Sequence, residues 1–140
     1  MNGLVEYPGK YRTKGVGIVK GSKIEHLAPP YTNVPFLMND LFDYLKDKTE
    51  LTLIKSCVFH YEMEFIHPFI DGNGRMGRFI MNLMLASGGY PWTVIPVQQR
   101  SKYMKSLEEA SVNLNILPFV EFLSHLVNES MQGKPVASIS

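Results

Sequence analysis

The hydrophobic pattern of the chain changes its period once, near Pro29-Pro30. Before these prolines, residues 15–27 hold a β-branched run, a Lys-Gly-Ser-Lys turn and a return run, which predicts a β-hairpin. After them, apolar residues recur every three or four positions, which predicts amphipathic helices. The helices are expected at residues 36–48, 52–65, 73–87, 98–112 and 118–131, followed by a frayed polar tail at 132–140.

The same spacing assigns an apolar face to each expected helix. Phe36 is placed on the buried face of the first helix, Phe79 and Leu83 on that of the third, and Met104 on that of the fourth. Cys57 falls on the apolar face of the second helix, where a thiol is expected to be inert. These faces predict a compact all-α domain that carries one hairpin.

The composition narrows the class of protein. The chain has 140 residues, so residues 1–131 are expected to form a single domain, and its 45% hydrophobic content excludes general disorder. A net charge of +1 argues against nucleic-acid binding driven by bulk charge, and one cysteine excludes a disulfide framework. The sequence shows neither a signal peptide nor a membrane-spanning run, so we expect a cytoplasmic protein with no membrane partner.

The richest chemistry lies in residues 67–78, which join two expected helices. This loop holds a histidine, a carboxylate, a Gly-Asn-Gly turn and two arginines within twelve residues. Pro68 ends the first helix, and the glycine-rich turn lets free N–H groups at the start of the next helix face an anion. Arg75 and Arg78 share one face of that helix and can clamp a phosphate group.

Two more side chains complete this interpretation of the loop. Asp71 can hold Mg²⁺ through one carboxylate while phosphate oxygens supply other ligands. His67 can accept a proton near neutral pH. Together these groups suit a nucleoside triphosphate, although no Walker loop is present. Each fragment alone is more often structural, and only their combination favours a functional site.

A metal site is the alternative interpretation of the same region. His60, Glu64 and His67 lie at i, i+4 and i+7 on one helical face, and the last two form half of a di-iron motif. A helical metal hydrolase would need a second such pair, and the sequence offers none. His60 is therefore expected to be a core histidine or one that supports a site residue.

The 67–78 loop closely resembles the signature of the Fic domain family, His-Pro-Phe-x-Asp/Glu-Gly-Asn-Gly-Arg-x-x-Arg, and every specified position is filled. The resemblance extends to a lead-in helix at 59–66, a hairpin region at 11–30 and a helix at 99–107 like the one that borders the adenine pocket. It covers roughly residues 8–128. It implies an all-α Fic fold with a β-hairpin flap.

The resemblance also implies an activity. Fic enzymes mostly transfer AMP from ATP to a Ser, Thr or Tyr hydroxyl of a target protein, with release of pyrophosphate, and often modify themselves. Carried over by position, His67 would be the general base and Asp71 would bind Mg²⁺. The anion hole and the remaining nucleotide contacts would come from Gly72, Asn73, Gly74, Arg75, Arg78 and Tyr103. Gly74 stands where kinase-like relatives have lysine, which favours nucleotidyl transfer.

The resemblance further implies two protein partners. A target segment would add as a strand to the flap, steered by Ile18 or Val19. Family members often carry an inhibitory Ser/Thr-x-x-x-Glu-Gly/Asn helix, whose glutamate would pair with Arg78. This chain has no such match, so an inhibitory helix is expected from a missing N-terminal segment or a separate protein. The alternatives left open are removal of AMP from a modified protein and a nucleotide-binding regulatory module.

Overall fold

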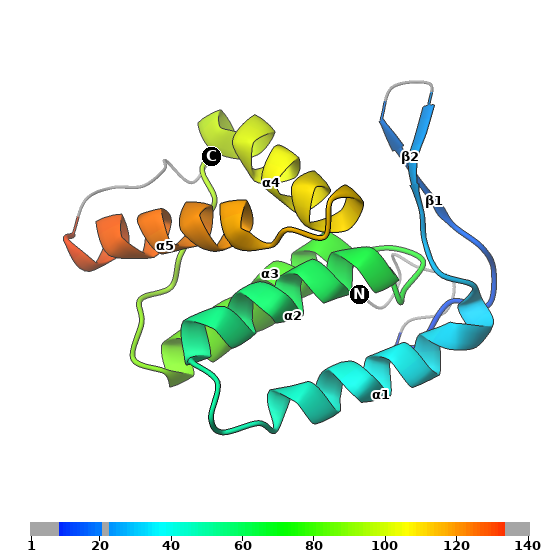
Figure 1. Cartoon of the computed structure of the whole chain (residues 1–140), viewed down its shortest axis with the longest axis horizontal. Helices are drawn as coiled ribbons and strands as arrows, with labels where there is room; N and C mark the ends of the chain where they lie inside the picture. Colours follow the sequence, from blue (N-terminus) through cyan, green and yellow to red (C-terminus); the bar gives the residue numbers. More distant parts are fainter. Residues whose placement is uncertain (1–8, 21–22, 134–140) are drawn as a thin grey trace.

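The computed structural model describes residues 9–20 and 23–133 (Figure 1). The expected tail at 132–140 lies outside the described residues from 134 onward. The elements are β1 (Gly17–Lys20), β2 (Lys23–Leu27), a 3₁₀ turn (Tyr31–Asn33), α1 (Val34–Leu45), α2 (Thr52–Ile66), α3 (Asn73–Ser87), a second 3₁₀ turn (Val97–Gln99), α4 (Arg100–Val112) and α5 (Leu117–Met131). The helical fold class predicted from the sequence is confirmed.

Strands β1 and β2 form an antiparallel pair that stands out from the helices (Figure 1). Gly17 pairs with Leu27 at the open end of this hairpin, and the register shifts between Ile18 and Val19, as in a β-bulge. The turn at residues 21–22 lies outside the described residues. A two-stranded sheet of this kind leaves a free edge on each strand.

The helix ends differ from the predicted ones in ways that the packing explains. Helix α1 begins at Val34 rather than at residue 36, because Val34 is fully buried and the next residue is a proline in the first turn, where proline is well tolerated. Helix α4 begins at Arg100, since residues 97–99 form a 3₁₀ turn. None of the described helices has the length and apolar character needed to span a bilayer.

Helix α2 lies at the centre of the domain, alongside α3 and between α1 and the α4–α5 pair (Figure 1). Cys57 belongs to a core cluster shared with α3, α4 and α5, while Phe59, Met63 and Ile66 pack in a second cluster with α1. Because α2 contributes to both clusters, the single apolar face predicted from the sequence describes only part of its burial.

Several residues predicted to be buried are instead exposed. The exposed fractions are 71% for Phe36, 51% for Phe79, 48% for Leu83 and 40% for Met104. Helix α3 turns a different face inward, because small and polar residues allow it to approach α2 closely. The residues on that face recur every four positions and include Asn73, Gly77, Met81 and Leu85.

Cys57 is fully buried and forms no disulfide. Burial raises the pKa of its thiol to about 12, because the thiolate would lose its hydration in the core. A thiol in this environment has little nucleophilic form at neutral pH.

Candidate active site

The 67–78 loop begins with a sharp exit from helix α2. His67 caps that helix in the left-handed conformation, with φ 51° and ψ 58°, and its N–H donates to the Met63 carbonyl at 3.0 Å. This conformation costs a non-glycine residue roughly 1–2 kcal/mol. Pro68 follows, so the chain cannot continue the helix, and the half-buried His67 is held at the turn between α2 and α3.

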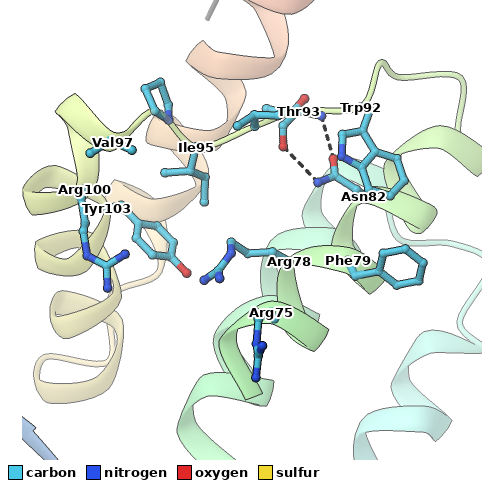
Figure 2. Close-up of a pocket in the computed structure, with 12 residues that line it drawn as sticks. Arg75, Arg78, Phe79, Asn82, Trp92, Thr93, Ile95, Val97, Arg100 and Tyr103 are labelled. Carbon is cyan, nitrogen blue, oxygen red and sulfur yellow. Dashed lines mark hydrogen bonds between the residues drawn. The ribbon is translucent and has the colours of Figure 1, made fainter. Parts of the chain in front are cut away.

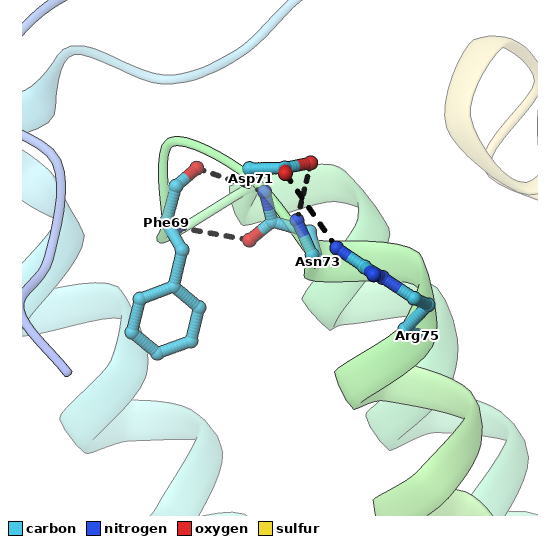
Figure 3. A network of polar contacts seen from close by, with 5 residues as sticks. Phe69, Asp71, Asn73 and Arg75 are labelled. Carbon is cyan, nitrogen blue, oxygen red and sulfur yellow. Dashed lines mark hydrogen bonds and ion pairs between the residues drawn. The ribbon is translucent and has the colours of Figure 1, made fainter. Parts of the chain in front are cut away.

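Asn73 closes the loop through its side-chain amide (Figure 3). The Phe69 N–H donates to Asn73 Oδ1 at 2.9 Å, and Asn73 Nδ2 donates to the Phe69 carbonyl at 2.8 Å. Asn73 is only 3% exposed. Both ends of its amide therefore fix the loop, and its expected part in an anion hole stays a prediction.

Asp71 lies at the start of α3 with its carboxylate largely exposed (Figure 3). Its Oδ1 accepts the Gly72 N–H at 2.8 Å, and its Oδ2 lies 3.5 Å from Arg75 Nη2. Gly72, the N-cap of α3, has φ 81°, which glycine adopts without strain. An exposed ion pair such as Asp71–Arg75 contributes roughly 0–1 kcal/mol, so it competes weakly with a cation. A single exposed carboxylate suits Mg²⁺ where phosphate oxygens supply other ligands.

A cavity of about 430 Å³ lies beside the first half of α3 (Figure 2). Its volume is within the usual range for small-molecule sites. The described residues that line it include three arginines and neither aspartate nor glutamate, which makes the cavity electropositive. They are Arg75, Arg78, Phe79, Asn82, Trp92, Thr93, Val94, Ile95, Pro96, Val97, Arg100 and Tyr103.

Tyr103 forms a buried part of the cavity wall, supported from behind by His60. The Tyr103 hydroxyl lies 2.5 Å from His60 Nε2, and the two residues are 3% and 0% exposed. Burial lowers the pKa of His60 to about 3 and raises the pKa of Tyr103 to about 12, a rise that the nearby Arg78 opposes. Both groups are therefore neutral at physiological pH.

Two glycines of α3 make room for these side chains. A Cβ on Gly77 would lie 2.8 Å from His60 Nδ1, which is closer than real Cβ contacts. A Cβ on Gly74 would lie 3.0 Å from Arg78 Nη1 and 3.1 Å from Glu64 Oε1. Burial raises the pKa of the Glu64 carboxyl, and the charge of Arg78 opposes that rise. Glycine at position 74 thus leaves space where Arg78 and Glu64 approach each other.

One pair that shapes the cavity was not predicted from the sequence. Asn82 Nδ2 donates to the Thr93 carbonyl at 3.0 Å, and the Thr93 N–H donates to Asn82 Oδ1 at 2.7 Å (Figure 2). Both residues are buried. This pair fixes the 92–97 segment over α3. The one sign of it in the sequence is Asn82 itself, a polar residue inside an apolar run.

The structure brings some of the predicted site residues together in one cavity and leaves others apart. Arg75, Arg78 and Tyr103 line one cavity, and Asp71 pairs with Arg75 at its edge. Ile18 and Val19 lie on β1, where their backbones pair with His26 and Ile24, and their predicted contact with a target stays a prediction.

The alternative metal site does not form in the part of the chain that the structure describes. No three His, Cys, Asp or Glu side chains gather there in a way that could hold a metal ion. His60 instead turns its Nε2 to Tyr103 and packs against Phe119. Its assignment as a core histidine is confirmed.

A strained histidine at a helix end, a tight turn into a second helix and an arginine-lined cavity together define a helical domain with a candidate anion site. The Fic/DOC family sequence model matches residues 1–85. The chain belongs to the Fic/DOC family.

The relatives agree with this assignment. Protein adenylyltransferase fic-1 of Caenorhabditis elegans is 32% identical over 127 residues, which cover 89% of this chain and 24% of that protein. Protein adenylyltransferase Fic of Drosophila melanogaster is 37% identical over 109 residues, covering 76% and 22% of the two chains. A Fic family protein from Desulfovibrio desulfuricans has a TM-score of 0.81 and 44% identity, covering 95% and 44%. The chain thus spans about a quarter of the length of these curated relatives.

Proposed function

We propose that this chain transfers AMP from ATP to a Ser, Thr or Tyr hydroxyl of a target protein and releases pyrophosphate. The observation that carries the proposal is the electropositive cavity at the start of α3, next to the loop that holds His67. Both curated relatives are named protein adenylyltransferases, which supports the transfer of AMP to a protein in general terms.

The phosphates of ATP would bind at the N-terminus of α3. The first N–H groups of a helix lack intrahelical partners and attract anions. Arg75 and Arg78 both line the adjoining cavity, and Arg78 points across it toward Tyr103 (Figure 2). The two arginines would hold the β- and γ-phosphates. Asp71 would hold Mg²⁺ together with phosphate oxygens, which neutralises charge on the nucleotide. Tyr103, in the cavity wall, would lie near the adenine.

The transfer itself is a displacement at the α-phosphorus. The target hydroxyl oxygen forms a bond to the α-phosphorus, the bond from that phosphorus to the pyrophosphate oxygen breaks, and His67 accepts the hydroxyl proton. A positioned general base typically contributes 10²–10⁴-fold to a rate. The target segment would dock on the hairpin as an added strand, with Ile18 or Val19 against its side chains.

We also propose how the transfer activity is inhibited and where in the cell it takes place. An inhibitory helix from another segment or a separate protein would act by pairing a glutamate with Arg78, which would remove that arginine from the γ-phosphate. We place the activity in the cytoplasm.

The test is intact-mass spectrometry of the purified chain after incubation with ATP and Mg²⁺, together with an assay of pyrophosphate release. The unaltered chain should gain the mass of AMP, and His67→Ala should lose at least roughly 100-fold in transfer rate while it still binds ATP. His125→Ala is the matched control, because His125 is exposed on α5 and pairs with Glu129 at 3.0 Å. It should transfer at the unaltered rate.

Other outcomes would contradict the proposal in identifiable ways. A gain of phosphate mass would indicate a kinase. ATP binding without added mass or released pyrophosphate would favour a nucleotide-binding regulatory module. Release of AMP from a modified protein, without transfer to an unmodified one, would indicate the reverse activity.

A further inference from the structure

Arg12 is a buried arginine that precedes the hairpin and has no part in the cavity. It is 2% exposed. Its guanidinium donates to main-chain carbonyls from three different segments of the chain. Among the described residues none of its partners is a carboxylate, so these contacts are not ion pairs but bonds that hold backbone segments together.

Two of these carbonyls belong to the end of α2. Arg12 Nε donates to the His67 carbonyl at 2.7 Å, and Arg12 Nη2 donates to the Ile66 carbonyl at 3.2 Å. The Arg12 main-chain N–H adds a bond to the Pro68 carbonyl at 2.8 Å. The Ile66 and His67 carbonyls lie at the negative end of α2, where a cation is favoured. The left-handed backbone of His67 is thus fixed by Arg12 on its carbonyl side.

The other two carbonyls flank the hairpin. Arg12 Nη1 donates to the Lys14 carbonyl at 2.9 Å, and Arg12 Nη2 donates to the Pro29 carbonyl at 2.5 Å. Lys14 precedes β1 and Pro29 follows β2, so the guanidinium holds both ends of the hairpin. Its planar fork spreads five N–H donors over three nitrogens and so reaches acceptors on separate segments, whereas the ammonium of lysine has three donors on one atom.

We infer that Arg12 is a positioning residue that holds the hairpin and His67 as one unit. The inference rests on the proposed function, in which the hairpin presents the target hydroxyl and His67 takes its proton. Transfer requires these two elements to keep a fixed separation, because a small displacement of a reacting group costs a large factor in rate. ATP binding uses α3 and α4 and does not require Arg12.

The first readout separates transfer from nucleotide binding. Arg12→Lys and Arg12→Gln are compared with Leu126→Ala, a matched control that destabilises the fully buried core of α5. Transfer rate is normalised to the number of ATP-binding sites measured by titration calorimetry. The Arg12 variants should transfer at least tenfold more slowly per site with ATP affinity unchanged within twofold, and Arg12→Lys should retain more rate than Arg12→Gln. Leu126→Ala should keep its full rate per site.

The second readout does not depend on activity. Amide hydrogen exchange by NMR follows the N–H groups of His67 and Phe69, which donate to the Met63 carbonyl of α2 and to Asn73 Oδ1. Arg12→Lys should exchange these amides at least tenfold faster while the amides of α5 keep their protection. If the unaltered chain transfers no AMP, the proposed function fails and this readout still decides whether Arg12 fixes the loop.

Three results would overturn the inference. One is a transfer rate per ATP site equal to that of the unaltered chain, and another is unchanged exchange at His67 and Phe69. The third is failure of both Arg12 variants to fold, because Arg12 would then support the whole domain rather than hold His67 against the hairpin.

Discussion

The neutral, buried His60 makes the stability of the domain sensitive to acid. Its pKa is about 3 in the folded chain, because burial disfavours the charged ring, and about 6.5 in an unfolded chain. Below pH 6.5 the unfolded chain binds a proton at this ring and the folded chain does not. Stability is therefore lost as the pH falls through the window from about 6.5 to about 3.

The size of this effect follows from the two pKa values. A difference of one proton bound changes the free energy of unfolding by about 1.36 kcal/mol per pH unit. Between pH 7 and pH 4.5, His60 should remove about 2–3 kcal/mol of stability, a large share of the roughly 5–15 kcal/mol typical of a domain. Burial raises the pKa values of Glu62 and Glu64, which act in the opposite direction, so a comparison variant is needed.

The assay is urea unfolding of the unaltered chain and of His60→Gln at a series of pH values from 7 to 4.5. Glutamine keeps a polar group near the Tyr103 hydroxyl and does not titrate. The variant should lose about 2–3 kcal/mol less stability than the unaltered chain over this range, while all other titrating groups cancel in the difference. Parallel stability curves for the two proteins would refute the argument that His60 is held neutral.

Two further predictions concern the loop and helix α3. Gly77→Ala should destabilise the domain by about 1–3 kcal/mol in chemical denaturation, because its Cβ would meet the His60 ring at 2.8 Å; Gly15→Ala, with nothing within 4 Å, is the matched control and should change stability little. Asn73→Ala should cost about 1–3 kcal/mol, since it leaves the Phe69 N–H and carbonyl without their partner. An Asn73→Ala chain with unaltered stability would show that this pair does not hold the loop.

Much of the fold could be predicted from the sequence, because the helical period of apolar residues and the glycines and prolines at the ends of elements are local signals. Helix α3 runs over Asn73–Ser87 as predicted, since a glycine precedes it and another follows it. The inward faces were harder to predict. Its apolar character predicts that Phe79 lies in the core, but Gly77 and Asn82 face inward instead. Which face of α3 turns inward depends on its contacts with α2 and with the 92–97 segment, and the periodicity of the sequence does not say where these lie.

The candidate site was likewise predictable only where the residues that form it are close together in the sequence. Arg75 and Arg78 could be placed on one face of a helix from their spacing alone, and both line the cavity. Arg12 could not be linked to His67, because the hydrogen bond between them joins residues 55 positions apart. From the sequence alone, a lone arginine before a hairpin would be interpreted as an exposed charge. Only the fold shows the carbonyls that surround Arg12.

The buried Cys57 has a practical consequence for experiments on this domain. It is the single cysteine of the chain, and a fully buried thiol with a pKa near 12 reacts slowly with maleimides and other thiol probes. A cysteine introduced at the exposed Thr13 could therefore be labelled selectively in the otherwise unaltered chain. A fluorophore or spin label at that position would report on the segment that leads from Arg12 into β1, while the native thiol in the core stays unlabelled.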